Sequence, residues 1–483
     1  MASLLSRIQR TSSGDTDKEV PSDAKNSSPT LLQEAITSDN IQRVEASAKV
    51  AQALSLTPTD DELKHSDRLI KAVSQIFGPR ISKTGLTEQL QKEITAAVVE
   101  EVCRVRKTYE DQERLKRIVL SSMFGLGPIE PYMSKSSTVS DILVHGYNLI
   151  FIEDETGLHK TDAQFYSEQH LRNVIERIVQ GAGKQINLIS PAVDAKLPDG
   201  SRVHATIPPI SPDGATLTIR RFNNRKLDIP EYIELKTLNL DMVNLLRFWV
   251  EAKLNIIVSG GTGSGKTSLL NVLSSFIPEN ELIITIEDNC ELQLRQPNVR
   301  RLEARQAIHH DDGSVEITIQ DLVRHSLRMR PDRIIVGEVR DGSIVDMLSA
   351  MSTGHEGSMS TIHSDSPQSL FDSRLPLLFS QYSVDFTREA QTLMCAESIH
   401  IVVQISRERN FRRVITKIAS VEGIDERTGR VKLHDIFTYS RSKDAFVFNP
   451  VPSPRLTALF EERGIDLPKE VAELYERGRT GTE

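Results

Sequence analysis

The residues with the clearest chemical meaning are the eight from Gly260 to Thr267, which read GGTGSGKT and fit the pattern G-x-x-x-x-G-K-[ST] in full. An apolar run, Ile256 to Val258, precedes them and a helical pattern follows, which is the context that this motif requires. Glycines let successive backbone N–H groups turn toward phosphate oxygens, and the start of the following helix adds partial positive charge. The motif therefore predicts a phosphate-binding loop, or P-loop, for ATP.

The polar residues of the loop have separate expected tasks. Lys266 is expected to reach the β- and γ-phosphates, and the Thr267 hydroxyl is expected to bind Mg²⁺. ATP and Mg²⁺ are therefore the predicted cofactors. The predicted nucleotide-binding residues are Gly260, Gly261, Thr262, Gly263, Ser264, Gly265, Lys266, Thr267 and Ser268.

Two glutamates stand where a P-loop needs carboxylate partners, at the ends of predicted buried strands. Glu287 follows the run Leu282 to Ile286, and Glu338 follows the run Arg333 to Val336 after one glycine. Carboxyl ends of parallel strands face the nucleotide crevice, so either glutamate can orient the attacking water or help to hold Mg²⁺, partly through water. The sequence does not decide which one is the general base.

Two histidines, His355 and His363, flank a short strand pattern after the second glutamate. A lone histidine is usually a structural residue. A pair beside a nucleotide-site strand is a candidate for sensing the γ-phosphate or coupling it to a neighbouring subunit. No third ligand stands at a suitable spacing, so we do not expect a metal site at this pair.

Alternating strands and helices must hold these residues. This alternation indicates a mostly parallel sheet with helices on both faces, and we predict an α/β fold with a RecA-like P-loop domain over residues 238–452. The predicted helices are 241–251, 267–275, 319–327 and 343–351, and the predicted strands are 255–258, 282–286 and 333–336.

The chain before this domain has a different pattern. Residues 1–58 are predicted to be a disordered tail with one helical pattern at 38–56, and residues 59–128 a helical bundle whose first helix ends at Gly78-Pro79. Residues 129–224 read as an α+β domain, 225–237 as a linker and 453–483 as a helical extension. The α+β pattern comprises a hairpin (139–144 with 149–153), a helix (167–180) and strands at 193–197, 202–207 and 215–220.

Composition limits the class of protein. The 483 residues are 38% hydrophobic and 26% charged, as in soluble globular chains of two or three domains. The formal charge of -8 gives no general attraction to nucleic acid or anionic lipid. Cys103, Cys290 and Cys395 are far apart and are expected to be reduced thiols. No stretch is apolar enough for a signal peptide or a membrane span, so we expect a cytoplasmic protein.

Four blocks resemble, in order, the Walker A, Asp box, Walker B and His box of the secretion and pilus ATPases of the type II/type IV secretion superfamily (GspE/PilT-like). They are residues 260–267, 285–288, 330–340 and 353–363. The resemblance covers about residues 60–440 and is closest to the CpaF branch, which powers tight-adherence (Flp-type) pili. The runs that carry this closeness are GLGPIEP at 125–131, VSDILV at 139–144, LPDGSR at 197–202 and TIRRF at 218–222.

The resemblance implies an α+β domain and a P-loop domain that enclose the nucleotide, and a ring of six identical chains. Arg202 and Arg220 stand where family members carry basic residues to the phosphates, although an ordinary surface ion pair would also explain each arginine. A polytopic inner-membrane platform protein is the implied partner, which would hold the chain at the inner face of the bacterial inner membrane. His145 replaces the usual Asn of CpaF relatives, and residues 375–396 match no motif.

The implied function is an ATP-hydrolysing motor for assembly of a Flp/Tad pilus or for protein secretion. The alternative is a DNA-translocating ring ATPase, because ring helicases share the P-loop core. The boxes at Glu287 and His355, the acidic charge and the lack of a basic, aromatic-rich platform favour secretion, so we expect no nucleic acid. A small-molecule kinase fits less well, because a long separate region precedes the P-loop domain and no acceptor-site signature is present. The cargo and the direction of the motor stay open.

Overall fold

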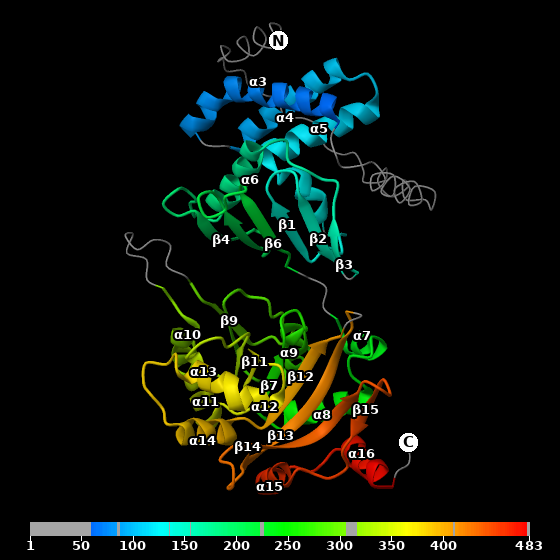
Figure 1. Ribbon diagram of the computed structural model, residues 1–483, viewed down its shortest axis with the longest axis vertical. Coiled ribbons are helices and arrows are strands. Elements are labelled where there is room, and N and C mark those ends of the chain that lie inside the picture. The colour runs from blue at the N-terminus through cyan, green and yellow to red at the C-terminus, as the bar shows by residue number, and fades with distance from the viewer. Residues whose placement is uncertain are drawn as a thin grey trace, which may run out of the picture. The chain divides into compact units, whose positions relative to one another are not determined.

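The computed structural model describes residues 59–84, 87–134, 136–154, 156–222, 227–305, 316–408 and 411–480. The chain divides into two compact units, the first ending at Phe222, and each is described by itself (Figure 1). The predicted tail and its helical pattern at 38–56 lie outside the described residues. Among the described residues, no helix is long and apolar enough to cross a membrane. The three cysteines form no disulfide.

Three helices begin the first unit: α3 (Asp60–Thr84), α4 (Glu88–Val105) and α5 (Tyr109–Phe124). Thr87 and Thr108 cap α4 and α5 with side-chain oxygens that accept backbone N–H groups. The predicted end of the first helix at Gly78-Pro79 is wrong, because α3 continues through Pro79. Val73 and Phe77 in α3 are buried in the cluster that the three helices share, and this packing offsets the weak helix propensity of glycine and proline.

A six-stranded antiparallel sheet follows, in the order β3-β2-β1-β6-β5-β4. The 3₁₀-helix η1 (Gly127–Met133) leads into it. Helix α6 (Glu168–Gly181) and alternate strand residues such as Ile142 and Ile219 form one buried cluster. The predicted hairpin is confirmed, with Ile142 opposite Ile152, and β3 was not predicted. The strands are β1 (Asp141–His145), β2 (Ile150–Asp154), β3 (Gly157–Lys160), β4 (Ala192–Lys196), β5 (Arg202–Thr206) and β6 (Thr216–Arg220).

The second unit is built on a nine-stranded sheet in the order β15-β14-β13-β12-β7-β11-β10-β8-β9. Strands β12 to β9 in this order pair in parallel, and β13, β14 and β15 extend the sheet antiparallel. This confirms the predicted α/β fold. The strands are β7 (Ile256–Gly260), β8 (Ile283–Glu287), β9 (Val299–Glu303), β10 (Arg333–Val336), β11 (Met359–His363), β12 (Ile401–Arg407), β13 (Arg413–Ile424), β14 (Val431–Ser440) and β15 (Ala445–Phe448).

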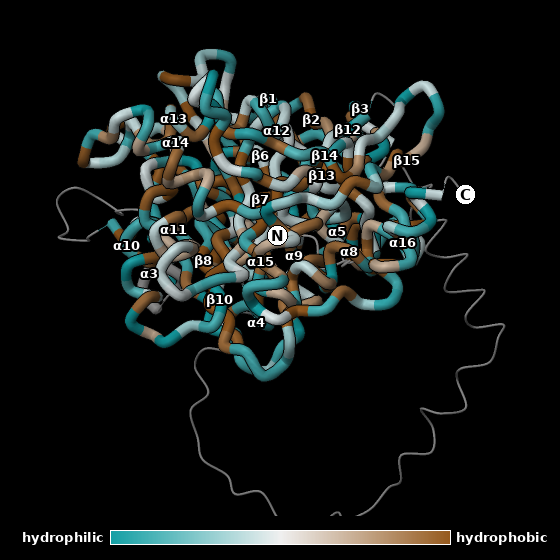
Figure 2. The backbone as a smooth tube through the Cα atoms, turned by 90° about the horizontal axis from the view of Figure 1, so that it is seen from below, coloured by the Kyte–Doolittle hydropathy of each residue, from teal (hydrophilic) through white to brown (hydrophobic). Residues whose placement is uncertain are grey.

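Helices pack on both faces of this sheet, as predicted. One buried cluster joins alternate strand residues such as Ile256 and Val258 to α8, α9, α15 and α16, and the other joins Ile257 and Ile284 to α10, α11, α13 and α14. Figure 2 shows the hydrophobic, brown stretches of β8 and β10, which this two-sided burial explains. The helices are α7 (Ile229–Glu234), α8 (Leu240–Glu251), α9 (Lys266–Ser274), α10 (Ile319–Ser326), α11 (Ser343–Ser352), α12 (Pro367–Ser369), α13 (Leu375–Phe379), α14 (Arg388–Ser398), α15 (Pro454–Arg463) and α16 (Lys469–Thr480), with a π-helical turn η2 (Leu370–Arg374).

Two segments outside the predicted P-loop domain are packed into this unit. The predicted linker contains α7, which has a capping box between Asp228 and Glu231 and a buried Tyr232. The C-terminal extension is helical, as predicted, and Phe460 in α15 packs against Phe248 in α8. Arg463 also donates to the Ala252 carbonyl at 3.1 Å. The extension is therefore part of the hydrophobic core of the second unit.

Candidate nucleotide site

The P-loop joins the end of β7 to the start of α9. Gly263 and Gly265 have φ values of +69° and +93°, in the left-handed region that glycine adopts without strain. Ser264 is buried and donates to the Gly261 carbonyl at 2.9 Å, which closes the turn. Gly265 is the N-cap of α9 and supplies no side-chain acceptor, so the first N–H groups of the helix stay available to a phosphate.

Lys266 is buried and lies over its own loop. Its Nζ donates to the Gly261 carbonyl at 3.0 Å and lies 3.2 Å from His363 Nε2. Burial lowers the pKa of Lys266 to about 8, against the opposing effect of the Glu338 charge. The lysine therefore carries its charge at pH 7 while it is largely shielded from water, which suits an ammonium group that binds phosphate.

Glu338 follows β10 by two residues and sits among positive groups. Its carboxylate accepts from Arg340 Nη2 at 2.5 Å and lies 2.9 Å from His363 Nε2. Burial would raise the pKa of Glu338, but the Arg340 hydrogen bond and the charges of Arg340 and Lys266 outweigh it and hold the pKa below its ordinary value. Glu338 is thus a carboxylate that stays ionised.

Glu287, the last residue of β8, has the opposite character. Its Oε1 accepts the backbone N–H groups of Glu291 and Leu292, both at 2.9 Å. Its Oε2 is buried and has no hydrogen-bond partner among the residues that the structure describes. Burial raises the pKa of Glu287 to about 7, despite the two N–H donors. The two predicted glutamates therefore differ in readiness to take up a proton.

The carboxyl ends of β7, β8, β10 and β11 bring four of the predicted side chains to one edge of the sheet. Lys266, His363 and Glu338 form a continuous row, and Glu287 packs against Gly337, where an added Cβ would lie 2.8 Å from its Cγ. Sequence reasoning missed Arg340, which binds Glu338 and lies 3.8 Å from Asp288. The available signal was its spacing, since residues two apart in an extended chain lie on the same side.

Within one chain, His355 does not contact the four side chains at the carboxyl ends of the strands. It belongs to the turn before β11, and its carbonyl accepts from Ser358 Oγ at 2.6 Å. The Ser358 carbonyl in turn accepts the N–H of Ile256, the first residue of β7, whereas the P-loop follows the last residue of β7. His355 thus lies at the amino ends of the strands and His363 at the carboxyl ends. Within one chain β11 therefore separates His355 from the P-loop, and the expected role of His355, in sensing the γ-phosphate or in coupling to a neighbouring subunit, stays a prediction.

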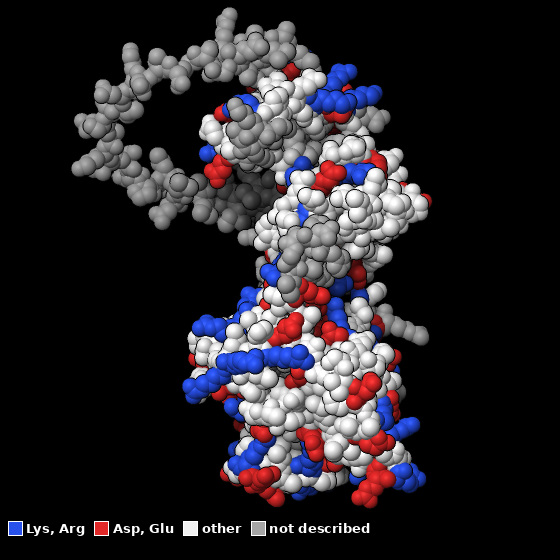
Figure 3. Space-filling view, turned by 90° about the vertical axis from the view of Figure 1, so that its left-hand side faces the viewer, with Lys and Arg blue, Asp and Glu red and all other residues white. Residues whose placement is uncertain are grey.

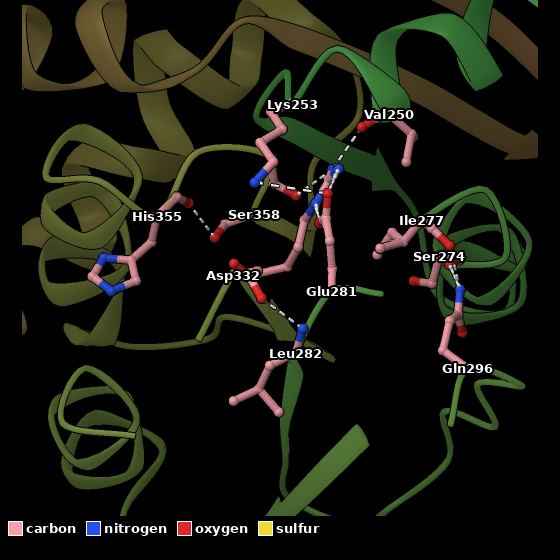
Figure 4. A network of polar contacts seen from close by, with 12 residues as sticks. Val250, Lys253, Ser274, Ile277, Glu281, Leu282, Gln296, Asp332, His355 and Ser358 are labelled. Atoms are coloured by element: carbon pink, nitrogen blue, oxygen red, sulfur yellow. Dashed lines mark hydrogen bonds and ion pairs between the residues drawn. The ribbon is translucent and has the colours of Figure 1, made fainter. Parts of the chain in front are cut away.

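A buried ion pair holds that opposite edge. Arg333, the first residue of β10, is fully buried, and its Nε lies 2.5 Å from Glu281 Oε2. Its Nη1 donates to the carbonyls of Val250 at 2.6 Å and Gly357 at 3.4 Å. Figure 4 shows Glu281 and Val250 converging here, with His355 and Ser358 beside them. The network ties α8, β10 and the turn before β11 together, far along the strands from the P-loop.

Arg202 and Arg220 belong to the first unit. They face each other across β5 and β6, and Arg220 Nε lies 2.9 Å from Asp141 Oδ1 on β1. Asp141 and Arg220 alternate along their strands with buried Ile142 and Ile219, so they lie on the sheet face away from the core that α6 helps to form. The expected contact of both arginines with phosphates stays a prediction.

Charges on the second unit are mixed. On the face displayed in Figure 3, Lys and Arg side chains are interspersed with Asp and Glu. This agrees with the formal charge of -8 for the whole chain. The displayed face therefore presents no broad surface of a single charge to an extended polyanion.

Comparison with known proteins gives consistent matches. The family model described as "Type II/IV secretion system protein" matches residues 123–482. Type IV secretion system protein PtlH of Bordetella pertussis is 31% identical over 326 residues, which cover 63% of this chain and 90% of that protein. Conjugal transfer protein TrbB of Rhizobium radiobacter is 32% identical over 292 residues, covering 59% and 85%. A crystal structure of the VirB11 ATPase of the Brucella suis type IV secretion system, in complex with sulphate, is 25% identical, with coverage of 62% and 97% and a TM-score of 0.33.

Proposed function

Because the chain belongs to the type II/IV secretion system protein family, we propose that it is an ATP-hydrolysing motor of a secretion or pilus machine. The observation that carries this proposal is the row of Lys266, His363 and Glu338 beside a complete P-loop. Family relatives such as PtlH are named as type IV secretion proteins, which fits a motor of this kind. ATP is therefore the proposed substrate.

The lysine and the histidine would hold the phosphates. Lys266 would exchange its hydrogen bond to the Gly261 carbonyl for contacts with the β- and γ-phosphates, and the N–H groups at the start of α9 would surround the β-phosphate. Burial and the nearby Lys266 charge lower the pKa of His363, so its imidazole is neutral at pH 7. A neutral imidazole at the γ-phosphate donates one hydrogen bond without adding charge.

The two glutamates divide the remaining work. Glu287 is the proposed general base, because a buried carboxyl with a pKa of about 7 and an unshared oxygen accepts a proton from water efficiently. Glu338 is kept ionised by Arg340, so it suits an electrostatic role toward a cation. Mg²⁺, when bound with ATP, neutralises phosphate charge; the Thr267 hydroxyl, with Glu338 acting through water, would hold it.

A finer proposal concerns the machine. The GLGPIEP and TIRRF runs support a Flp/Tad-type pilus motor of the CpaF branch. We propose six copies in a ring, with Arg202 and Arg220 reaching phosphates and a polytopic inner-membrane platform protein as partner. The chain would then lie at the cytoplasmic face of the inner membrane through that partner. The resemblance supports each of these statements.

Steady-state ATP hydrolysis tests the proposal. Purified protein is compared with Lys266→Ala, each with and without Mg²⁺ and single-stranded DNA. We expect slow turnover that requires Mg²⁺, is lost in the variant and ignores DNA. Strong stimulation by DNA would instead favour the DNA-translocating ring ATPase, and turnover that survives in Lys266→Ala would show that the P-loop is not the site.

A further inference from the structure

The β12–β13 hairpin contacts the P-loop. Strand β12 lies beside β7 in parallel, with Gln404 opposite Ser259, the penultimate residue of β7. At the next position, the Ile405 carbonyl lies directly against Gly260, where a Cβ would collide with it. Gly260 is therefore needed for this close approach of the hairpin.

The pairing of β12 with β13 has an irregularity close to the P-loop. Gln404 faces Lys417, but Ile405 faces Ile415, so Thr416 is an extra residue on β13. A bulge of this kind bends the strand and redirects the side chains beyond it. Arg413, the first residue of β13, lies beyond the bulge and reaches the P-loop.

Arg413 touches the loop at two points. Its Nε donates to the Gly263 carbonyl at 3.3 Å, across 150 residues of sequence. Its Cδ lies 2.9 Å from the position that a Cβ on Gly265 would take. The side chain thus contacts both glycines that have positive φ, and its hydrogen bond holds the peptide group between Gly263 and Ser264.

The same hairpin is also hydrogen-bonded to the segment from α7 to Thr237. The N–H of Ile415 donates to the Thr237 carbonyl at 2.9 Å, and Thr237 donates in turn to the Tyr232 carbonyl of α7 at 2.9 Å. Thr237 and Tyr232 are both buried. Ile415, two residues from Arg413, is therefore hydrogen-bonded to a buried segment, and such support helps to position a side chain.

We propose that Arg413 is a positioning residue for nucleotide binding, which fixes the Gly263–Gly265 part of the P-loop in its phosphate-binding conformation. The inference rests on the proposed function, because the ligand is the nucleotide of that same site. The guanidinium donates to a carbonyl oxygen of the loop, whereas phosphates are bound by the loop N–H groups, so its effect passes through backbone geometry. Loss of the contact between Arg413 and the P-loop should weaken binding of ADP and ATP alike. KM should therefore rise, and kcat should stay nearly unchanged.

The experiment compares Arg413→Gln with Arg412→Gln in the full chain. Arg412 is the matched control, because its guanidinium binds Asp444 at 2.5 Å and packs against Tyr439. Binding of a fluorescent ADP analogue with Mg²⁺ gives Kd, and ATP hydrolysis gives KM and kcat. We expect Arg413→Gln to raise Kd and KM roughly three- to tenfold, the effect of one hydrogen bond, and Arg412→Gln to change both less than twofold.

Arg413→Lys separates positioning from simple charge, since lysine keeps the charge and most of the stem but lacks the Nε donor. We expect its Kd to stay raised; full recovery would overturn the proposal in favour of a charge effect. Equal Kd values for wild type and Arg413→Gln, or equal losses in the Arg412 control, would also overturn it. If the wild type itself does not bind nucleotide while it is folded, the proposed function fails and the inference fails with it.

Discussion

Lys266 Nζ lies 3.2 Å from His363 Nε2, so the P-loop lysine and the last residue of β11 touch each other at the edge of the sheet. Strands β7 and β11 are parallel neighbours, with His363 opposite Gly260, and this register alone places the histidine at the P-loop. The contact distinguishes His363 from His355, and the predictions below begin from that difference.

Replacement of the two histidines should have unequal effects. His363→Ala is expected to lower kcat about 10²-fold, because it removes a preorganised donor at the γ-phosphate. His355→Ala should leave the Kd for Mg-ADP within twofold of wild type, because β11 separates this residue from the P-loop. Steady-state kinetics and nucleotide titration check both. A comparable loss of kcat in the two variants would contradict the statement that, within one chain, only His363 acts at the γ-phosphate.

Glu287→Gln should strongly reduce turnover but keep nucleotide binding. Without a general base, kcat should fall roughly 10²- to 10⁴-fold. In the wild type, kcat should rise with pH through about 7, as the buried carboxyl loses its proton. The measurement is a pH profile of kcat at saturating Mg-ATP. If kcat does not change between pH 6 and pH 8, Glu287 is not the general base. Glu338→Gln is the matched variant, because it replaces the other predicted glutamate.

The same carboxyl should influence stability. Its folded-state pKa of about 7 lies above the ordinary 4.5, so the folded protein binds more protons than the unfolded chain between these values. Stability therefore falls as pH rises through this window. Glu287→Gln removes the free-energy cost of a buried ionised carboxylate and should raise the free energy of unfolding at pH 8 by on the order of 1–3 kcal/mol. Urea unfolding at pH 5 and pH 8 tests it, with little gain expected at pH 5.

The ion pair at the opposite edge should be structural. Arg333→Leu leaves the Glu281 carboxylate and the Val250 carbonyl without their main partner, which should destabilise the second unit by about 3–5 kcal/mol. The change should leave the affinity of folded protein for Mg-ADP unaltered. Thermal unfolding and nucleotide titration measure the two effects. The double variant Arg333→Leu, Glu281→Leu is the control, and it should recover part of the stability because no buried charge is left alone.

Sequence alone determined the P-loop, its flanking strand and helix, and the glutamates at the ends of β8 and β10. These depend on local patterns: an apolar run must be a buried strand, and a motif of fixed spacing must turn immediately after it. Helix ends were less certain, and α3 continues past Gly78-Pro79 because packing of Phe77 outweighs local propensity.

Which of these side chains meet depends on the three-dimensional fold. His355 and His363 are close in sequence, but an extended strand carries them to opposite edges of the sheet. The pKa difference between Glu287 and Glu338 depends on how deeply the fold buries each carboxyl and on the hydrogen bond from Arg340 to Glu338. Arg413 reaches the P-loop across 150 residues because β13 pairs with β12, which lies beside β7. Contacts of this kind depend on strand order and register, which no local pattern in the sequence encodes.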